Sequence, residues 1–325
     1  MLRQVEKSLE VLKQLKLERN LEELAKRASE MAERQAEIAD SLNKISPEEA
    51  AELTPEEQAL KREMEELLKQ MQETAELAEQ MDDSLAMEMG ELNESAGEIP
   101  QDMESMSGQM SSGQNSLASQ SGQRISQSLS QMSQSLSNMK DRMTSRKKRE
   151  LVKKMMAAVR ELVALSQQQE NLKTESSEMS PRSPGYRERA EIQSGIEEGL
   201  ERVTNKLFEL SRQTYFVTPE IGQHLGHAAN LMRSALESYT ARNPRQVTPQ
   251  QTGAMEQMNR AAVALLDAME QMNQSGSSTG FQEMMEKLQE IAEKQSQLNK
   301  QTEGMGIPKP GEGGMPMPMG AEGGL

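Results

Sequence analysis

The chain of 325 residues has no cysteine and no tryptophan, and aromatic residues make up only 2% of it. Without cysteine it can form no disulfide and can offer no thiolate as a nucleophile or metal ligand. Large aromatic side chains supply much of the buried area in ordinary globular cores. Their scarcity therefore indicates packing along narrow apolar seams rather than around one large globular core.

Long apolar runs and positive net charge are missing too. No stretch approaches the roughly 18 apolar residues of a membrane span, and the first residues contain no apolar signal core. A cytoplasmic location is therefore the default expectation. The alternative, if the chain is part of a longer anchored protein, is the bacterial cell envelope on the periplasmic face of a membrane. The net charge of -15 argues against nucleic acid as the main partner, because phosphates require a basic surface.

Motifs for catalysis are also absent from the sequence. It contains neither a glycine-rich phosphate loop with lysine nor a Gly-x-Ser-x-Gly nucleophile motif. The two histidines, His224 and His227, have a spacing that a metal site could use, but a di-iron helix bundle needs Glu-x-x-His motifs and neither histidine has one. The sequence therefore predicts no catalytic, cofactor-binding or metal-binding residues and no cofactor, and indicates that the protein is not an enzyme. The role of the histidines stays open.

Apolar residues at alternating spacings of four and three dominate the first part of the chain, from Leu17 to Ile45 and from Leu60 to Leu92. Such heptads are typical of coiled coils and long helical hairpins. Between the two runs, Ser46 and Thr54 each precede Pro-Glu-Glu, a signature of a capped helix start that can close a capping box. The sequence predicts an all-α fold that begins with a long helical hairpin over residues 1–95.

Residues 96–145 are rich in Ser, Gln, Met and Gly. Because Ser and Gly disfavour helices, we predict a linker over 96–123, and a helix over 124–176, where the four-three spacing returns; disorder through residue 145 is the open alternative. The predicted helix carries a basic cluster, interpreted as a solvated face that pairs with acidic helices; contact with anionic lipid or nucleic acid is the alternative. The cluster consists of Lys140, Arg142, Arg146, Lys147, Lys148, Arg149, Lys153 and Lys154.

Residues 186–273 hold five of the six aromatic residues and both histidines. Proline-containing starts at Thr218 and Thr248 separate three amphipathic stretches, which predicts an up-down-up three-helix bundle over 186–273. Glycines spaced four apart predict close backbone approach within it, at Gly195, Gly199, Gly222 and Gly226. Beyond the bundle we expect a helix over 280–303 and a disordered Gly/Pro-rich tail over 304–325.

One local pattern occurs three times and places a glutamine on the apolar seam: Gln35 in MAERQAEI, Gln169 in LSQQQENL and Gln295 in IAEKQSQL. A polar seam residue lowers stability but can fix register or partner number. The alternative is coincidence in a glutamine-rich chain.

The pattern resembles the C-terminal helical region of large bacterial membrane-anchored proteins of the family called domain of unknown function 4175. The resemblance covers mainly residues 150–303, through motifs such as LSQQQENLKTES and IAEKQSQLNKQT. In that family, transmembrane helices precede a long, low-complexity helical region. This chain lacks those segments, and the resemblance implies no activity.

Sustained heptads without a catalytic constellation favour a non-enzymatic structural or interaction protein, a helical scaffold or assembly arm. Its expected partners are other proteins, or further copies of itself that join through the heptad seams, with membrane contact only through a longer anchored protein. The alternative is a holdase-like or envelope-assembly helper, because 27 methionines could form adaptable apolar surfaces.

Overall fold

A computed structural model describes residues 2–280, 283–287, 289–290 and 293–294, with side chains described from Val11 onward. Every regular element in these ranges is an α-helix, which confirms the predicted all-α fold. The helices are α1 (Leu2–Leu42), α2 (Pro47–Glu52), α3 (Thr54–Glu79), α4 (Asp83–Ala96), α5 (Ile99–Ser111), α6 (Asn115–Ser177), α7 (Tyr186–Ser211), α8 (Pro219–Thr240) and α9 (Pro244–Gln274).

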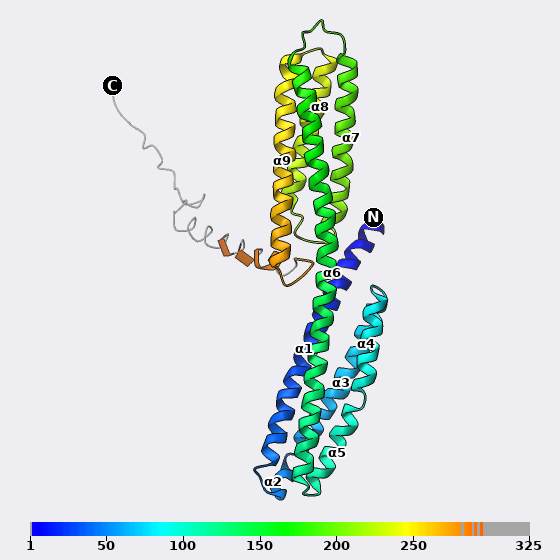
Figure 1. Ribbon diagram of the computed structural model, residues 1–325, viewed down its shortest axis with the longest axis vertical. Coiled ribbons are helices and arrows are strands. Elements are labelled where there is room, and N and C mark those ends of the chain that lie inside the picture. The colour runs from blue at the N-terminus through cyan, green and yellow to red at the C-terminus, as the bar shows by residue number, and fades with distance from the viewer. Residues whose placement is uncertain (1, 281–282, 288, 291–292, 295–325) are drawn as a thin grey trace, which may run out of the picture. The chain divides into compact units, whose positions relative to one another are not determined.

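Two bundles share the long helix α6 (Figure 1). In the N-terminal bundle, α1, α3, the broken pair α4–α5 and the first half of α6 surround a core that extends from Leu17 to Met139. In the C-terminal bundle, the second half of α6 packs with α7, α8 and α9 around a core from Leu151 to Met272. Both bundles close their apolar seams within one chain.

The hairpin predicted over residues 1–95 is incomplete as a description of the N-terminal bundle. Helices α1 and α3 are neighbours, but α1 packs more extensively against α6, which lies far away in sequence. The capping box predicted at Ser46 forms: Glu49 N donates to Ser46 Oγ at 3.3 Å, and Ser46 N donates to Glu49 Oε2 at 2.8 Å. The one predicted at Thr54 does not form, because the helix already includes that residue.

The linker predicted over residues 96–123 is wrong, because this segment contains the end of α4, all of α5 and the start of α6. A row of serines that begins in this segment and continues along α6 stabilises the pairing of α6 with α1. Ser119, Ser126 and Ser133 of α6 each donate a side-chain hydrogen bond to a carbonyl of α1, at 2.7–2.8 Å. The acceptors are the carbonyl oxygens of Ala39, Ala32 and Ala25.

Small residues are needed where α1 and α6 pack this closely. A Cβ atom added at Gly122 would lie 2.8 Å from the Cβ of Ala39, closer than side chains tolerate. Serine, alanine and glycine therefore suit this interface, although serine and glycine lower helix propensity. The serine and glycine content that indicated a linker therefore reflects the tight packing of α1 against α6.

The bundle predicted over residues 186–273 contains the three expected helices but needs α6 as a fourth. The third helix begins at Pro244, because proline suits the first helical position, and Pro249 lies inside it. Close approach at the glycine pairs is wrong at Gly195, Gly222 and Gly226, whose added Cβ atoms would meet nothing within 4 Å. Only Gly199 faces a close neighbour, a side-chain atom of Leu165.

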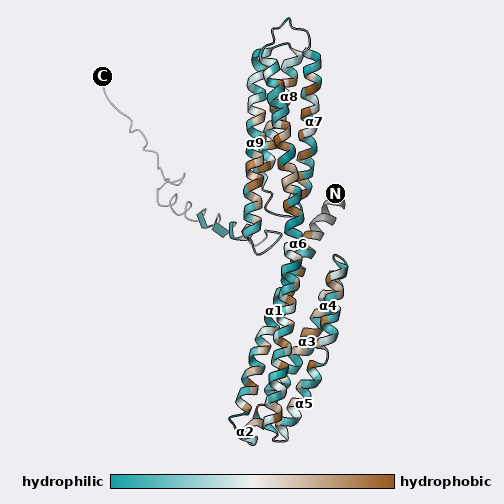
Figure 2. Cartoon of the chain, in the orientation of Figure 1, coloured by the Kyte–Doolittle hydropathy of each residue, from teal (hydrophilic) through white to brown (hydrophobic). Residues whose placement is uncertain are grey.

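Figure 2 shows the hydrophobic residues of the helices among many polar ones. Among the helices that the structure describes, none is both long and apolar enough to cross a membrane. Within the range 280–303, residues 283–287, 289–290 and 293–294 are helical. Gly280 is not helical, and the other residues of that predicted helix and the tail over 304–325 lie outside the described residues.

Candidate binding surface on helix α6

The basic cluster occupies the part of α6 between the two cores, and several of its members are paired with acids of other helices. Lys140 Nζ lies 3.0 Å from Glu22 of α1. Arg142 bonds to Glu88 of α4, and Arg146 lies 3.0 Å from Asp82. This pairing fits the interpretation of a solvated basic face that meets acidic helices.

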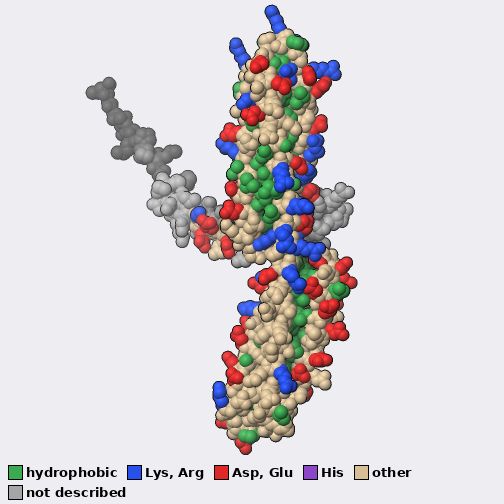
Figure 3. All heavy atoms as spheres, viewed as in Figure 1, with side chains coloured by type: hydrophobic (Ala, Val, Ile, Leu, Met, Phe, Trp, Pro, Cys, Tyr) green, Lys and Arg blue, Asp and Glu red, His purple; other side chains and the backbone are tan. Residues whose placement is uncertain are grey.

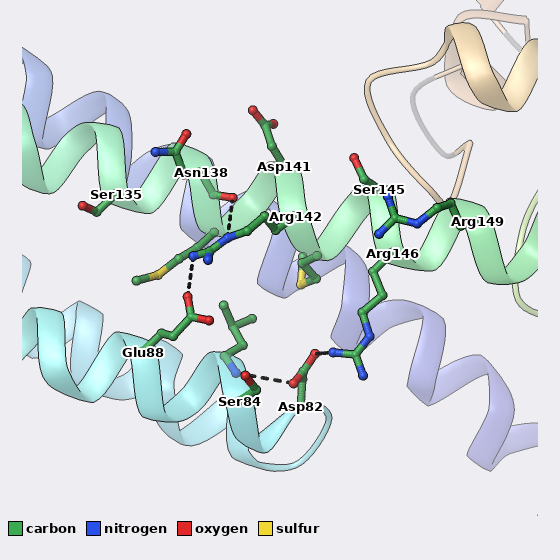
Figure 4. Close-up of a pocket in the computed structure, with 13 residues that line it drawn as sticks. Asp82, Ser84, Glu88, Ser135, Asn138, Asp141, Arg142, Ser145, Arg146 and Arg149 are labelled. Atoms are coloured by element: carbon green, nitrogen blue, oxygen red, sulfur yellow. Dashed lines mark hydrogen bonds and ion pairs between the residues drawn. The ribbon is translucent and has the colours of Figure 1, made fainter.

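A cleft of about 800 Å³ separates α4 from α6 at this cluster (Figure 4). Glu88 and Asp82 extend from α4 and its N-terminal turn toward Arg142 and Arg146 of α6. Asp82 also accepts a hydrogen bond from Leu85 N at 3.4 Å, so one carboxylate caps α4 and pairs with α6. Because α4 packs mainly against α3, these charged contacts are a minor link between α4 and α6.

The loop after α9 joins the two bundles through a buried carboxylate, Glu18 of α1. Its two oxygens accept hydrogen bonds from Ser278 Oγ at 2.7 Å and Ser277 Oγ at 2.9 Å. Thr214 of the α7–α8 loop donates to the carbonyls of Ser278 and Thr279, both at 3.3 Å. The junction is therefore tied by side chains as well as by the continuous helix α6.

A second buried carboxyl group, that of Glu57, lies in the N-terminal core; it was expected to cap a helix and instead points inward. Gln35 Nε2 donates to Glu57 Oε2 at 2.9 Å and contacts Met106 Sδ at 3.1 Å. Burial raises the pKa of Glu57 to about 7; the bond from Gln35 opposes the rise and the charge of Glu56 adds to it. Neither Gln35 Oε1 nor Glu57 Oε1 has a partner among the described atoms.

The C-terminal core contains a neutral polar layer instead. Gln169 and Gln193 exchange two hydrogen bonds, at 2.8 and 2.9 Å. Gln251 Nε2 donates to Gln193 Oε1 at 3.1 Å and to the Tyr239 hydroxyl at 2.9 Å. The Tyr239 hydroxyl also bonds to Ser176, and burial raises the pKa of Tyr239.

Two of the three repeated seam glutamines, Gln35 and Gln169, are fully buried and hydrogen-bonded in different bundles. The third, Gln295, lies outside the described residues. Sequence reasoning missed their partners Glu57 and Gln193, although a spacing signal existed. Glu57 lies three residues before Leu60, and Gln193 three before Ile196, so both continue a heptad seam. Ile192, the apolar residue just before Gln193, is 44% exposed instead.

The histidines lie on one helix but have different surroundings. His224 Nδ1 lies 2.7 Å from Gln257 Oε1, and its Nε2 lies 3.8 Å from Glu220. His227 is exposed. In the part of the chain that the structure describes, no three His, Asp or Glu side chains are grouped so that they could hold a metal ion.

A scan of the chain against protein-family models gave no match, and comparisons with curated proteins and with solved structures gave none either. The resemblance to the domain of unknown function 4175 family therefore stays a prediction from short sequence motifs. Any function must be argued from the geometry of the two bundles and of α6.

Proposed function

We propose that this protein is a non-enzymatic helical scaffold that holds two helix bundles on one continuous helix and presents the surface of that helix to a protein partner. The observation that supports this most directly is α6: its 63 residues supply core side chains to both bundles without a break. A helix of that length extends about 95 Å at 1.5 Å per residue. The bonds to Glu18 add a second tie at the junction.

Partner binding through heptad seams has less support than binding through the surface, because the seams are already buried inside each bundle. The holdase alternative has less support as well. Most described methionines lie in the cores, while Met81, Met87 and Met285 are the ones with large exposed fractions. Both compartments expected from the sequence, the cytoplasm and the envelope, are compatible with a scaffold.

The test uses the absence of cysteine, which makes introduced thiols unique labelling sites. Spin labels at Ser128→Cys and Glu170→Cys, both exposed on α6, are separated by 42 residues and therefore by about 63 Å along the helix. If the scaffold is rigid, double electron–electron resonance should give a narrow distribution of label-to-label distances centred near that value. A variant with four glycines inserted between Arg146 and Lys147 is the control and should broaden it. A broad or much shorter distribution in the unmodified chain would contradict the proposal.

A further inference from the structure

A second hollow lies on the C-terminal bundle, between α6 and α9, and its volume is about 690 Å³. Four of its lining residues are basic and none is acidic, on a chain whose net charge is -15. The basic residues are Lys148, Arg149, Lys153 and Arg160. Val152 and Met156 of α6 form an apolar floor between them and α9, which contributes Asn273.

The apolar floor continues along both helices beyond the hollow. Val163 follows Met156 by seven residues, and Leu266 precedes Asn273 by seven, so helical spacing places each on the same face as its partner. Val163 is 41% exposed, Leu266 44% and the neighbouring Val263 56%. In Figure 3 hydrophobic side chains gather over this bundle, with Lys and Arg near its end. We call the floor formed by Val152, Met156, Val163, Val263 and Leu266 the α6–α9 groove.

Three cations on the rim of the α6–α9 groove differ from the ion-paired members of the basic cluster. Arg149, Lys153 and Arg160 form no ion pair with any side chain that the structure describes. Lys148 donates to the carbonyl of Ser275. Arg149 and Arg160 are 11 residues apart, about 16 Å along the helix, which corresponds to roughly three turns of a bound helix. Unpaired cations beside exposed apolar side chains are complementary to an acidic, amphipathic ligand.

The α9 side of the groove carries the opposite charge. Asp267 and Glu270 are exposed there, beside Leu266 and Val263. A uniformly anionic surface such as a lipid membrane would be repelled by these two acids while it was attracted to α6. A single helix can match both sides, because its two edges can carry different charges while its inner face stays apolar.

We propose that the α6–α9 groove binds one amphipathic helix of a partner protein, with leucine-like side chains on its inner face and acidic residues along the edge that faces α6. This inference rests on the proposed scaffold function and gives the chemistry of the partner. Apolar anchors at positions i, i+3 or i+4, and i+7 of the ligand would cover the floor. Its acids would pair with Arg149, Lys153 and Arg160, which steers binding and sets the direction of the helix.

The test uses the full chain and a fluorescent synthetic helix of about 15 residues, with leucines at helical spacing, glutamates along one edge and lysines along the other. We expect Arg149→Glu with Lys153→Glu to weaken binding by fluorescence anisotropy at least about tenfold. Leu266→Ser should weaken it about threefold, since it removes apolar contact without charge. The matched control, Arg182→Glu with Arg245→Glu, makes the same charge change at exposed sites outside the groove and should leave the affinity unchanged.

Three results would overturn the docking proposal. A scrambled peptide of equal composition that binds as tightly as the amphipathic one would show that charge alone explains the binding. Phosphatidylserine vesicles that bind through Arg149 and Lys153 when the peptide does not would assign the surface to a membrane. A change in oligomeric state of these variants by light scattering would assign it to a second copy. If the peptide fails while the spin-label distance along α6 stays narrow, docking is wrong and the scaffold stands; a broad distance rejects the scaffold itself.

Discussion

The two bundles solve the same packing problem with different side chains. In the N-terminal bundle, small residues bring α1 and α6 together, and a row of serines bonds across the contact. In the C-terminal bundle, a T-shaped pair of Tyr186 and Tyr239, with ring centroids 6.4 Å apart, packs beside a layer of amides. Small-residue packing needs little apolar volume per helix, which is how a chain with few aromatics can build a core.

The buried polar groups sharpen the difference. Gln169 in the C-terminal bundle meets another amide and exchanges two bonds with it. Gln35 in the N-terminal bundle meets a carboxyl group, and one oxygen on each side is left without a partner among the described atoms. An ionised buried carboxylate is costly, whereas a paired amide is satisfied. The stability of the N-terminal bundle should therefore depend on pH, and the stability of the C-terminal bundle should not.

The largest expected effect comes from giving the C-terminal bundle a buried carboxyl group. Gln193→Glu removes a donor to Gln169 and buries a charge at pH 8, so we expect a loss of about 3–5 kcal/mol in the free energy of unfolding. Much of the loss should be recovered at pH 5, where the carboxyl group is protonated. Urea unfolding at pH 8 and pH 5 measures the free energy of unfolding of the variant, and the exposed Gln168→Glu is the control. A variant equally stable at both pH values would contradict the comparison.

The reverse change, Glu57→Gln, should give the N-terminal bundle the amide pair of its neighbour. The folded carboxyl group keeps its proton up to about pH 7, while the unfolded one loses it near pH 4.5. Between these values the folded state binds more protons, so stability falls as the pH rises, by up to about 3 kcal/mol above pH 7.

Glu57→Gln should therefore stabilise the protein above pH 7 and flatten its stability between pH 4.5 and 7. Hydrogen exchange of α1 and α3 at several pH values measures the change in the bundle that contains Glu57. The exposed Glu73→Gln serves as the matched control and should leave the pH dependence in place. An unchanged slope in Glu57→Gln would show that another group causes it.

A smaller effect is expected from the serine row. Ser126→Leu inserts a larger side chain where α1 and α6 are close and removes the bond to Ala32 O, so we expect a loss of about 2 kcal/mol. Ser128→Leu, two residues away on an exposed position, should be nearly neutral. Thermal unfolding by circular dichroism compares the two, and equal melting temperatures would mean that small residues are not required at this contact.

The smallest effect concerns the short helix α4 of the N-terminal bundle. Arg142→Ala with Arg146→Ala removes its ion pairs with Glu88 and Asp82. Because such exposed pairs contribute less than about 1 kcal/mol, amide exchange in α4 should accelerate only about two- to fivefold. Arg124→Ala, an exposed site on the same helix, is the control. Faster exchange throughout the N-terminal bundle would show a larger role for these pairs.

Heptad spacing alone located most of the apolar seams. The same spacing placed Gln35 and Gln169 on those seams, and both are buried in the cores. Amino-acid composition gave a wrong prediction in the segment that is richest in serine and glycine. Residues 96–123 looked like a linker because serine and glycine disfavour isolated helices, yet α1 accepts a hydrogen bond from Ser119 and packs closely against Gly122. Glu57 looked like a cap because Thr54 and Pro55 precede it, but its seam position relative to Leu60 prevailed.

By itself the sequence determined that the protein is helical and where most core faces lie, because the period of apolar residues is a local property. Only the tertiary structure decided which seams meet: that α1 packs on α6, that α6 serves two bundles, and that Gln35 meets an acid while Gln169 meets an amide. It alone placed unpaired cations beside the apolar groove between α6 and α9. Those pairings join residues far apart in the chain, and local periodicity contains no information about the partner of a face.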